Sequence, residues 1–278
     1  MPEPAALTWV DDTHFRVGDV AFVCSFAESS PEHFCIRKPR RLVERTVEFL
    51  EGFRPAHVVE LGVAFGGSAA LIELVGSPRK HVGLELNETR VAALDALIAR
   101  RGWHDALRLF FGVDQADRAR VAAIARDEFR GAPLDLVVDD ASHGLDETRV
   151  SFETLFPLLR PGGVYVIEDW NWQLKLAFAL RQGLREQGTA RPPAELDAPE
   201  RTVWKPDAVA RTIEESFRRP PLETLVAELV LARACSGDAV ADVSVDADWA
   251  LVRRGPGDLD ADGFRVADIY VDRGILGH

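Results

Sequence analysis

The chain has 278 residues, enough for one large α/β domain with additional segments. Its 45 acidic and 33 basic residues give a net charge of −12, which argues against a nucleic-acid partner because such partners are bound mainly by Lys and Arg. Small molecules or neutral sugars fit this charge better. The three cysteines form neither a CxxC pair nor an even set, and no apolar run approaches the roughly 20 residues that span a bilayer. We therefore expect a cytoplasmic protein, neither secreted nor membrane-inserted.

The first 36 residues predict a β-hairpin that precedes the main fold. Apolar residues alternate weakly on both sides of Gly18-Asp19. We expect residues 1–36 to form a cap or a dimer contact, which would make the protein a homodimer, and residues 37–278 to form one domain. The basic run 37–41 could contact an anionic ligand, but the favoured interpretation is the solvated start of a helix over 42–53.

From about residue 40 to residue 169, strand patterns and helix patterns alternate. Short β-branched or aromatic runs predict strands at 57–61, 81–86, 108–111, 136–138 and 164–167. Apolar residues at helical spacing predict helices at 40–53, 68–74, 88–101, 116–129 and 147–159, the last ended by Pro161-Gly162-Gly163. This alternation predicts an α/β fold, a doubly wound Rossmann-like sheet that is mostly parallel.

The last hundred residues are less regular. The patterns predict a helix over 170–186, a surface loop over 188–200 and a helix over 207–217. Two final apolar runs, 240–245 and 249–252, flank Asp246-Ala247-Asp248 and predict an antiparallel hairpin at the sheet edge.

A glycine-rich turn from Gly62 to Ser68 joins the first predicted strand of the large sheet to the next helix. Glycines let a backbone approach a ligand closely beside the free amides of a helix N-terminus. The G-x-G-x-x-G spacing of dinucleotide sites is absent, because position 64 is Ala and the glycines stand at 62, 66 and 67. NAD is therefore disfavoured. A purely structural turn is the alternative to a cofactor loop.

The pattern E-x-G-x-x-x-G, which begins at Glu60, resembles motif I of class I S-adenosylmethionine-dependent methyltransferases. The resemblance implies a ribose-binding acid at the end of the next strand, where Glu85 stands and where a carboxylate can accept hydrogen bonds from both ribose hydroxyls. It also implies adenine contacts after the third strand. The residues implied to bind the cofactor are Glu60, Gly62, Gly66, Ser68, Glu85, Asp114 and Gln115.

Acidic residues end the fourth and fifth predicted strands. Asp140 follows one, and Glu168 and Asp169 follow the other. Neighbouring strands lie about 4.8 Å apart, so these carboxylates could share a cation, and oxygen ligands without Cys favour Mg²⁺. The alternative is that some of them cap helices or face solvent. His143, in the loop after Asp140, could accept a proton from a substrate hydroxyl.

The sequence D-D-A-S-H, followed by L-x-P-G-G-V-Y-V-I-E-D, resembles the macrocin O-methyltransferase family, which acts on sugars of macrolide antibiotics. The resemblance covers about residues 37–170. It implies that Asp140, Glu168 and Asp169 bind Mg²⁺ and that His143 is the general base, with Asp139 left as a structural residue. Ala141 stands where the family commonly has Gly.

We therefore expect an S-adenosylmethionine- and Mg²⁺-dependent O-methyltransferase that acts on a hydroxyl of a small-molecule or oligosaccharide sugar. Trp170 and Trp172 could pack against the sugar ring or belong to the core. One alternative is methylation of a catechol or another vicinal diol. The other is a protein that binds S-adenosylmethionine without transferring its methyl group.

Overall fold

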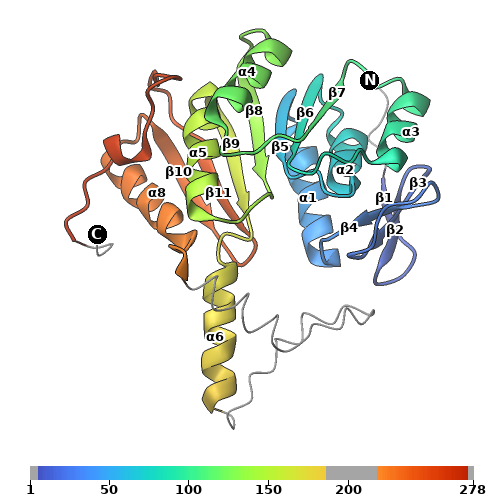
Figure 1. Cartoon of the computed structure of the whole chain (residues 1–278), viewed down its shortest axis with the longest axis horizontal. Coiled ribbons are helices and arrows are strands. Elements are labelled where there is room, and N and C mark those ends of the chain that lie inside the picture. Colours follow the sequence, from blue (N-terminus) through green and yellow to red (C-terminus); the bar gives the residue numbers. More distant parts are fainter. Residues whose placement is uncertain (1–5, 186–217, 275–278) are drawn as a thin grey trace.

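The computed structural model describes residues 6–185 and 218–274, with side chains described except at 179–185. The loop expected over 188–200 and the helix expected over 207–217 lie outside these residues. Two sheets are present (Figure 1). No helix among the described residues is both long enough and apolar enough to cross a membrane.

The smaller sheet is formed by the N-terminal part of the chain. Its strands, in spatial order, are β1 (Leu7–Trp9), β2 (His14–Val17), β3 (Val20–Cys24) and β4 (Phe34–Ile36). The predicted hairpin is β2 and β3, which pair antiparallel around Gly18. The sheet is larger than predicted, because β4 adds to β3 in parallel and its Phe34 ring packs against Phe22.

The larger sheet has seven strands in the order β10-β11-β9-β8-β5-β6-β7. The five strands from β9 to β7 in this order run parallel. The final hairpin, β10 and β11, joins the sheet through β11, which pairs antiparallel with β9, as predicted. The strands are β5 (His57–Leu61), β6 (Lys80–Glu85), β7 (Leu107–Phe111), β8 (Leu134–Asp139), β9 (Leu159–Glu168), β10 (Val240–Val245) and β11 (Trp249–Arg254).

Helices cover both faces of this sheet and bury two apolar cores. One core lies under α1 (Arg40–Phe53), α2 (Gly67–Gly76) and α3 (Ala92–Arg101), and includes the smaller sheet. The other lies under α4 (Arg118–Phe129), α5 (Leu145–Leu155) and α8 (Glu223–Cys235). Helix α6 (Trp172–Arg185) projects away from the sheet (Figure 1). The doubly wound prediction is therefore confirmed.

Two element boundaries differ from the prediction for local reasons. Helix α3 begins at Ala92 instead of residue 88, because the Asn87 side chain accepts a hydrogen bond from the Thr89 amide and forms a turn there. Helix α5 ends at Leu155 in a short 3₁₀ turn, so Pro161-Gly162-Gly163 does not end it. Those three residues instead lie within β9, where the pairing with β8 shifts register.

Candidate active site

The carboxyl ends of the parallel strands open into one cavity of about 1040 Å³. Because right-handed crossovers place the loops after parallel strands at the same sheet edge, residues far apart in the sequence meet there. The strands contribute residues such as Leu61, Glu85, Asp114, Asp140 and Asp169. Residues between 26 and 38, next to the small sheet, form another wall. The cavity therefore combines the predicted cofactor loop with two of the three predicted metal acids, Asp140 and Asp169; Glu168 is not among the described residues that line it.

The glycine-rich turn is shaped by close backbone approaches. Gly62 has φ of +88°, and a Cβ there would lie 2.2 Å from the Asp140 carbonyl oxygen. A Cβ on Gly67 would lie 2.2 Å from the carbonyl oxygen of Cys35. Larger residues at these positions would displace backbone. The turn therefore brings β5 and α2 against both the metal side of the cavity and the N-terminal segment.

Glu85 lies at the end of β6, as predicted, and lines the cavity. Its Oε2 accepts a hydrogen bond of 2.7 Å from the Ala64 amide, and its Oε1 accepts one of 2.8 Å from the Asn87 amide. These bonds fix the carboxylate beside the glycine-rich turn. An ionised carboxylate has about four acceptor positions, so each oxygen can still accept a hydrogen bond from a ligand.

Of the other predicted cofactor residues, four line the cavity and two do not. Gly62, Ser68 and Asp114 line the cavity, and Asp114 is exposed. Gln115 also lines it, but its amide donates to Asp139 and Ser151 and its carbonyl accepts from the Ser142 amide. Gln115 thus also supports the loop that carries His143.

Glu60 and Gly66 are not among the described residues that line the cavity. Gly66 is buried at the N-terminus of α2. Glu60 is fully buried in the protein interior, where its Oε2 lies 3.4 Å from Nε2 of His81. Nδ1 of the same imidazole lies 3.2 Å from Glu73. Burial lowers the pKa of His81, but hydrogen bonds and charge from Glu60 and Glu73 outweigh it and raise that pKa to about 9.

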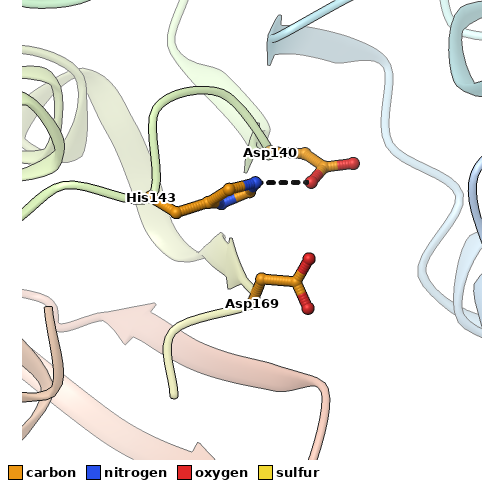
Figure 2. A group of neighbouring side chains, drawn as sticks. All are labelled: Asp140, His143 and Asp169. Carbon is orange, nitrogen blue, oxygen red and sulfur yellow. Dashed lines mark ion pairs between the residues drawn. The ribbon is translucent and has the colours of Figure 1, made fainter. Parts of the chain in front are cut away.

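Asp140, His143 and Asp169 come together at the ends of β8 and β9 (Figure 2). Each offers one ligand atom, and these atoms lie within 4.8 Å of one another. Nε2 of His143 lies 3.8 Å from Oδ1 of Asp140. Such a spacing of carboxylate oxygens and an imidazole nitrogen suits a divalent cation.

Glu168, the third predicted metal ligand, is held differently. It is buried, and its Oε2 accepts a short hydrogen bond from Nζ of Lys38, which also donates to Oδ2 of Asp140 at 2.8 Å. Burial and the nearby Asp140 charge raise the pKa of Glu168 to about 7, and the Lys38 ammonium opposes this rise. The structure thus brings Glu168 beside Asp140, but with an ammonium group between the two carboxylates.

Lys38 is a site residue that the sequence analysis missed. Its side chain is only 6% exposed, so the solvated interpretation of the basic run 37–41 is wrong at this position. Burial lowers the pKa of Lys38, but the charges of Asp140 and Glu168 more than compensate and raise it above its usual range. The available signal was the position of Lys38 two residues after an apolar strand run, Phe34–Ile36.

Asp139 is buried beneath the site, consistent with the structural role expected for it. Its carboxylate accepts hydrogen bonds from the hydroxyls of Tyr165, at 2.7 Å, and Ser151, at 2.8 Å. Burial raises the pKa of Asp139 and these bonds oppose the rise. The network anchors the end of β8.

Trp172 also supports the site, because its indole N–H donates to the His143 carbonyl at 2.9 Å. That contact holds a loop residue whose φ is +53°. The sequence had suggested Trp172 only as a sugar-packing or core residue.

Known proteins resemble part of this chain. No family model matches it. A mycinamicin VI 2''-O-methyltransferase of Micromonospora griseorubida is 52% identical over 56 residues, which cover 20% of this chain and 13% of the relative. A demethylmacrocin O-methyltransferase of Streptomyces fradiae is 38% identical over 76 residues, which cover 22% of this chain and 19% of the relative. The matches thus span less than a fifth of each relative.

A solved structure agrees over much more of the chain. A methyltransferase of Podospora anserina, solved with S-adenosylhomocysteine, superposes with a TM-score of 0.51 at 16% identity and covers 78% of this chain and 79% of its own. This likeness concerns the fold. Over these stretches the chain is similar in sequence to sugar O-methyltransferases, and over most of its length it is similar in fold to this methyltransferase. Its strand order and its hairpin at the β10 edge are those of the Rossmann-like methyltransferase fold.

Proposed function

We propose that the protein transfers the methyl group of S-adenosylmethionine to a sugar hydroxyl with the help of a divalent cation such as Mg²⁺. The observation that carries the proposal is that Glu85, beside the glycine-rich turn, and the group Asp140, His143 and Asp169 line one cavity. A methyl transfer needs its donor and its acceptor hydroxyl aligned side by side, and alignment alone lowers such barriers strongly. The local matches to two sugar O-methyltransferases support the same class of acceptor.

The residues around the turn fit the cofactor. Gly62 lines the cavity, and the absence of a side chain there lets the turn pack directly against the Asp140 backbone. Glu85 is preoriented by two amide donors and keeps acceptor positions for ribose hydroxyls. Asp114, exposed on the same cavity wall, is available to the base of the nucleoside.

The residues after β8 and β9 fit a divalent cation. Asp140 and Asp169 supply carboxylate oxygens within one group, and Glu168 is buried beside Asp140, where its carboxylate needs positive charge nearby. In this proposal these three residues hold the ion. When bound, the ion supplies positive charge beside the acceptor oxygen, and the cofactor supplies a methyl group already activated as a sulfonium.

The remaining task for the protein is to align the acceptor and remove its proton. His143 is only partly exposed and faces Asp140, so it can receive the hydroxyl proton while the nearby carboxylate stabilises the resulting imidazolium. Trp172 fixes the His143 backbone through its carbonyl, and Gln115 fixes the neighbouring Ser142 amide. These contacts keep the base in place without relying on the substrate.

The experiment is an assay of S-adenosylhomocysteine formation by mass spectrometry, with Mg²⁺ and a panel of free sugars, glycosylated macrolides and catechols. Methylation of a sugar hydroxyl, dependent on Mg²⁺ and absent after chelation, is the expected result. If only catechols are methylated, the acceptor is a vicinal aromatic diol and not a sugar. Calorimetric binding of S-adenosylmethionine with no turnover on any acceptor would refute the transferase activity. Location in the cytoplasm and a homodimer stay predictions.

A further inference from the structure

Lys38 occupies an unusual place, because it inserts a buried ammonium group between two carboxylates that the proposed function assigns to a cation. The side chains of Lys38 and Glu168 are each 6% exposed. Lys38 stands just before Pro39 and the N-terminus of α1, whereas Asp140 follows β8 and Glu168 ends β9 in the large sheet. The contact therefore links the N-terminal segment directly to the centre of the site.

The two contacts satisfy one oxygen of each acid. Nζ lies 2.8 Å from Oδ2 of Asp140 and forms a short hydrogen bond with Oε2 of Glu168. The other Asp140 oxygen, Oδ1, faces His143. The carboxylates of the buried Glu168 and the half-buried Asp140, which share one donor, would repel each other without a cation between them. The ammonium supplies that cation.

A divalent ion held by Asp140 and Glu168 would stand close to the ammonium, whichever carboxylate oxygens it used. Like charges a few ångströms apart in a partly buried site repel by kilocalories even at an effective dielectric constant of about 20. Resting on the proposed function, we propose that Lys38 is a built-in counter-cation that competes with the divalent metal for Asp140 and Glu168. The protein thus keeps a stable site before metal loading and binds the metal more weakly than its three acids alone would.

The first test is Lys38→Met, which keeps the aliphatic chain and removes the charge. The expected result is Mg²⁺ binding tighter by on the order of tenfold in calorimetry, because the competing charge is gone. The metal-free variant should melt on the order of 5 °C or more below the wild type, and saturating Mg²⁺ should restore most of the loss. Lys38→Arg, which keeps the charge, should not bind Mg²⁺ more tightly.

A matched control comes from a second lysine ion pair away from the site. Lys80, at the start of β6, pairs with Glu128 at 2.5 Å and donates to the Asp105 carbonyl. Lys80→Met should lower the melting temperature without changing Mg²⁺ affinity and without a recovery on adding Mg²⁺. This control separates the loss of any lysine ion pair from the loss of a competing charge.

A second measurement uses the wild-type chain and covers the case in which Lys38→Met does not fold. The chain has lysines only at 38, 80, 175 and 205, so reductive methylation followed by mass spectrometry reports each amine separately. Lys38 should react slowly in protein stripped of metal with a chelator and several-fold faster with saturating Mg²⁺, relative to Lys80 and the exposed Lys175.

The outcomes are distinguishable. Unchanged or weaker Mg²⁺ binding by a folded Lys38→Met variant overturns the inference about Lys38 and leaves the proposed function standing. If the variant does not fold, a Lys38 amine that stays equally protected with Mg²⁺ overturns the inference. If neither the wild type nor the variant binds Mg²⁺, the metal in the proposed function fails and the inference fails with it.

Discussion

The cavity has two halves: the turn half faces the glycine-rich turn, and the metal half lies at the ends of β8 and β9. The charges of the acids in and behind these halves are balanced in different ways. Behind the half that faces the glycine-rich turn, in the protein interior, Glu60 and Glu73 lie on either side of His81, a group that can lose its charge in the working pH range. In the half at the ends of β8 and β9, Asp140 and Glu168 are joined by Lys38, which stays charged. We therefore expect the turn half to respond to pH and the metal half to respond to divalent ions.

The largest expected effect belongs to the metal half alone. His143→Ala should lower methyl transfer by about 100-fold to 10,000-fold, because the acceptor hydroxyl loses its proton acceptor. S-adenosylmethionine affinity, measured by calorimetry, should stay unchanged, because the cofactor is bound in the turn half and His143 lies in the metal half. His104→Ala is the matched control, since that histidine is exposed before β7. Full activity of His143→Ala would show that His143 is not the general base.

Gly62 is where the two halves touch, so Gly62→Ala should damage both. The new Cβ would lie 2.2 Å from the Asp140 carbonyl oxygen, at φ of +88°. We expect a loss of about 3 kcal/mol in the free energy of unfolding, together with weaker cofactor and Mg²⁺ binding.

Gly102→Ala separates the two causes of this loss. Gly102 has φ of +69°, but a Cβ added there would meet no atom within 4 Å, so only backbone strain of about 1 kcal/mol should be measured. Equal losses measured by urea unfolding in the two variants would mean that the contact with Asp140 is unimportant.

The turn half can be tested through pH. The pKa of His81 is raised from 6.5 to about 9 in the folded protein, so its stabilising contribution is fully present below pH 6.5 and is lost as the pH rises to 9. At about 1.4 kcal/mol per pKa unit, the loss amounts to at most about 3 to 4 kcal/mol. Urea unfolding of wild type and His81→Gln between pH 6 and pH 9.5 measures it.

The His81→Gln variant should be less stable than the wild type at pH 6, and its free energy of unfolding should lack most of the fall between pH 6.5 and pH 9. Subtracting the two curves removes the titrations that both proteins share. An equally steep fall in His81→Gln would show that another group is responsible, and the contrast between the two halves would then lose its basis.

How well the sequence predicted each half depends on how local its signals are. The alternation of strands and helices and the glycine spacing from Gly62 are read within short windows, and the structure confirms the fold they predict. The acids Asp140, Glu168 and Asp169 were placed at one edge because consecutive parallel strands end there. Lys38 was missed because its partners lie 102 and 130 residues away, and a basic run carries no sign of burial.

Glu85→Gln is expected to produce the smallest effect and the most selective one. The amide keeps the size of the side chain but replaces one acceptor oxygen by a donor beside the amides of Ala64 and Asn87, so the group is both neutral and partly mismatched. S-adenosylmethionine affinity should fall by about tenfold, which is the size of one charge-assisted hydrogen bond. Calorimetry with Mg²⁺ alone should show unchanged metal binding, because Glu85 contacts only the turn half. Glu88→Gln is the matched control, as it removes an exposed carboxylate three residues further on that does not line the cavity. Equal losses in both variants would trace the effect to overall charge, whereas a loss confined to Glu85→Gln would assign cofactor recognition to the turn half independently of the metal.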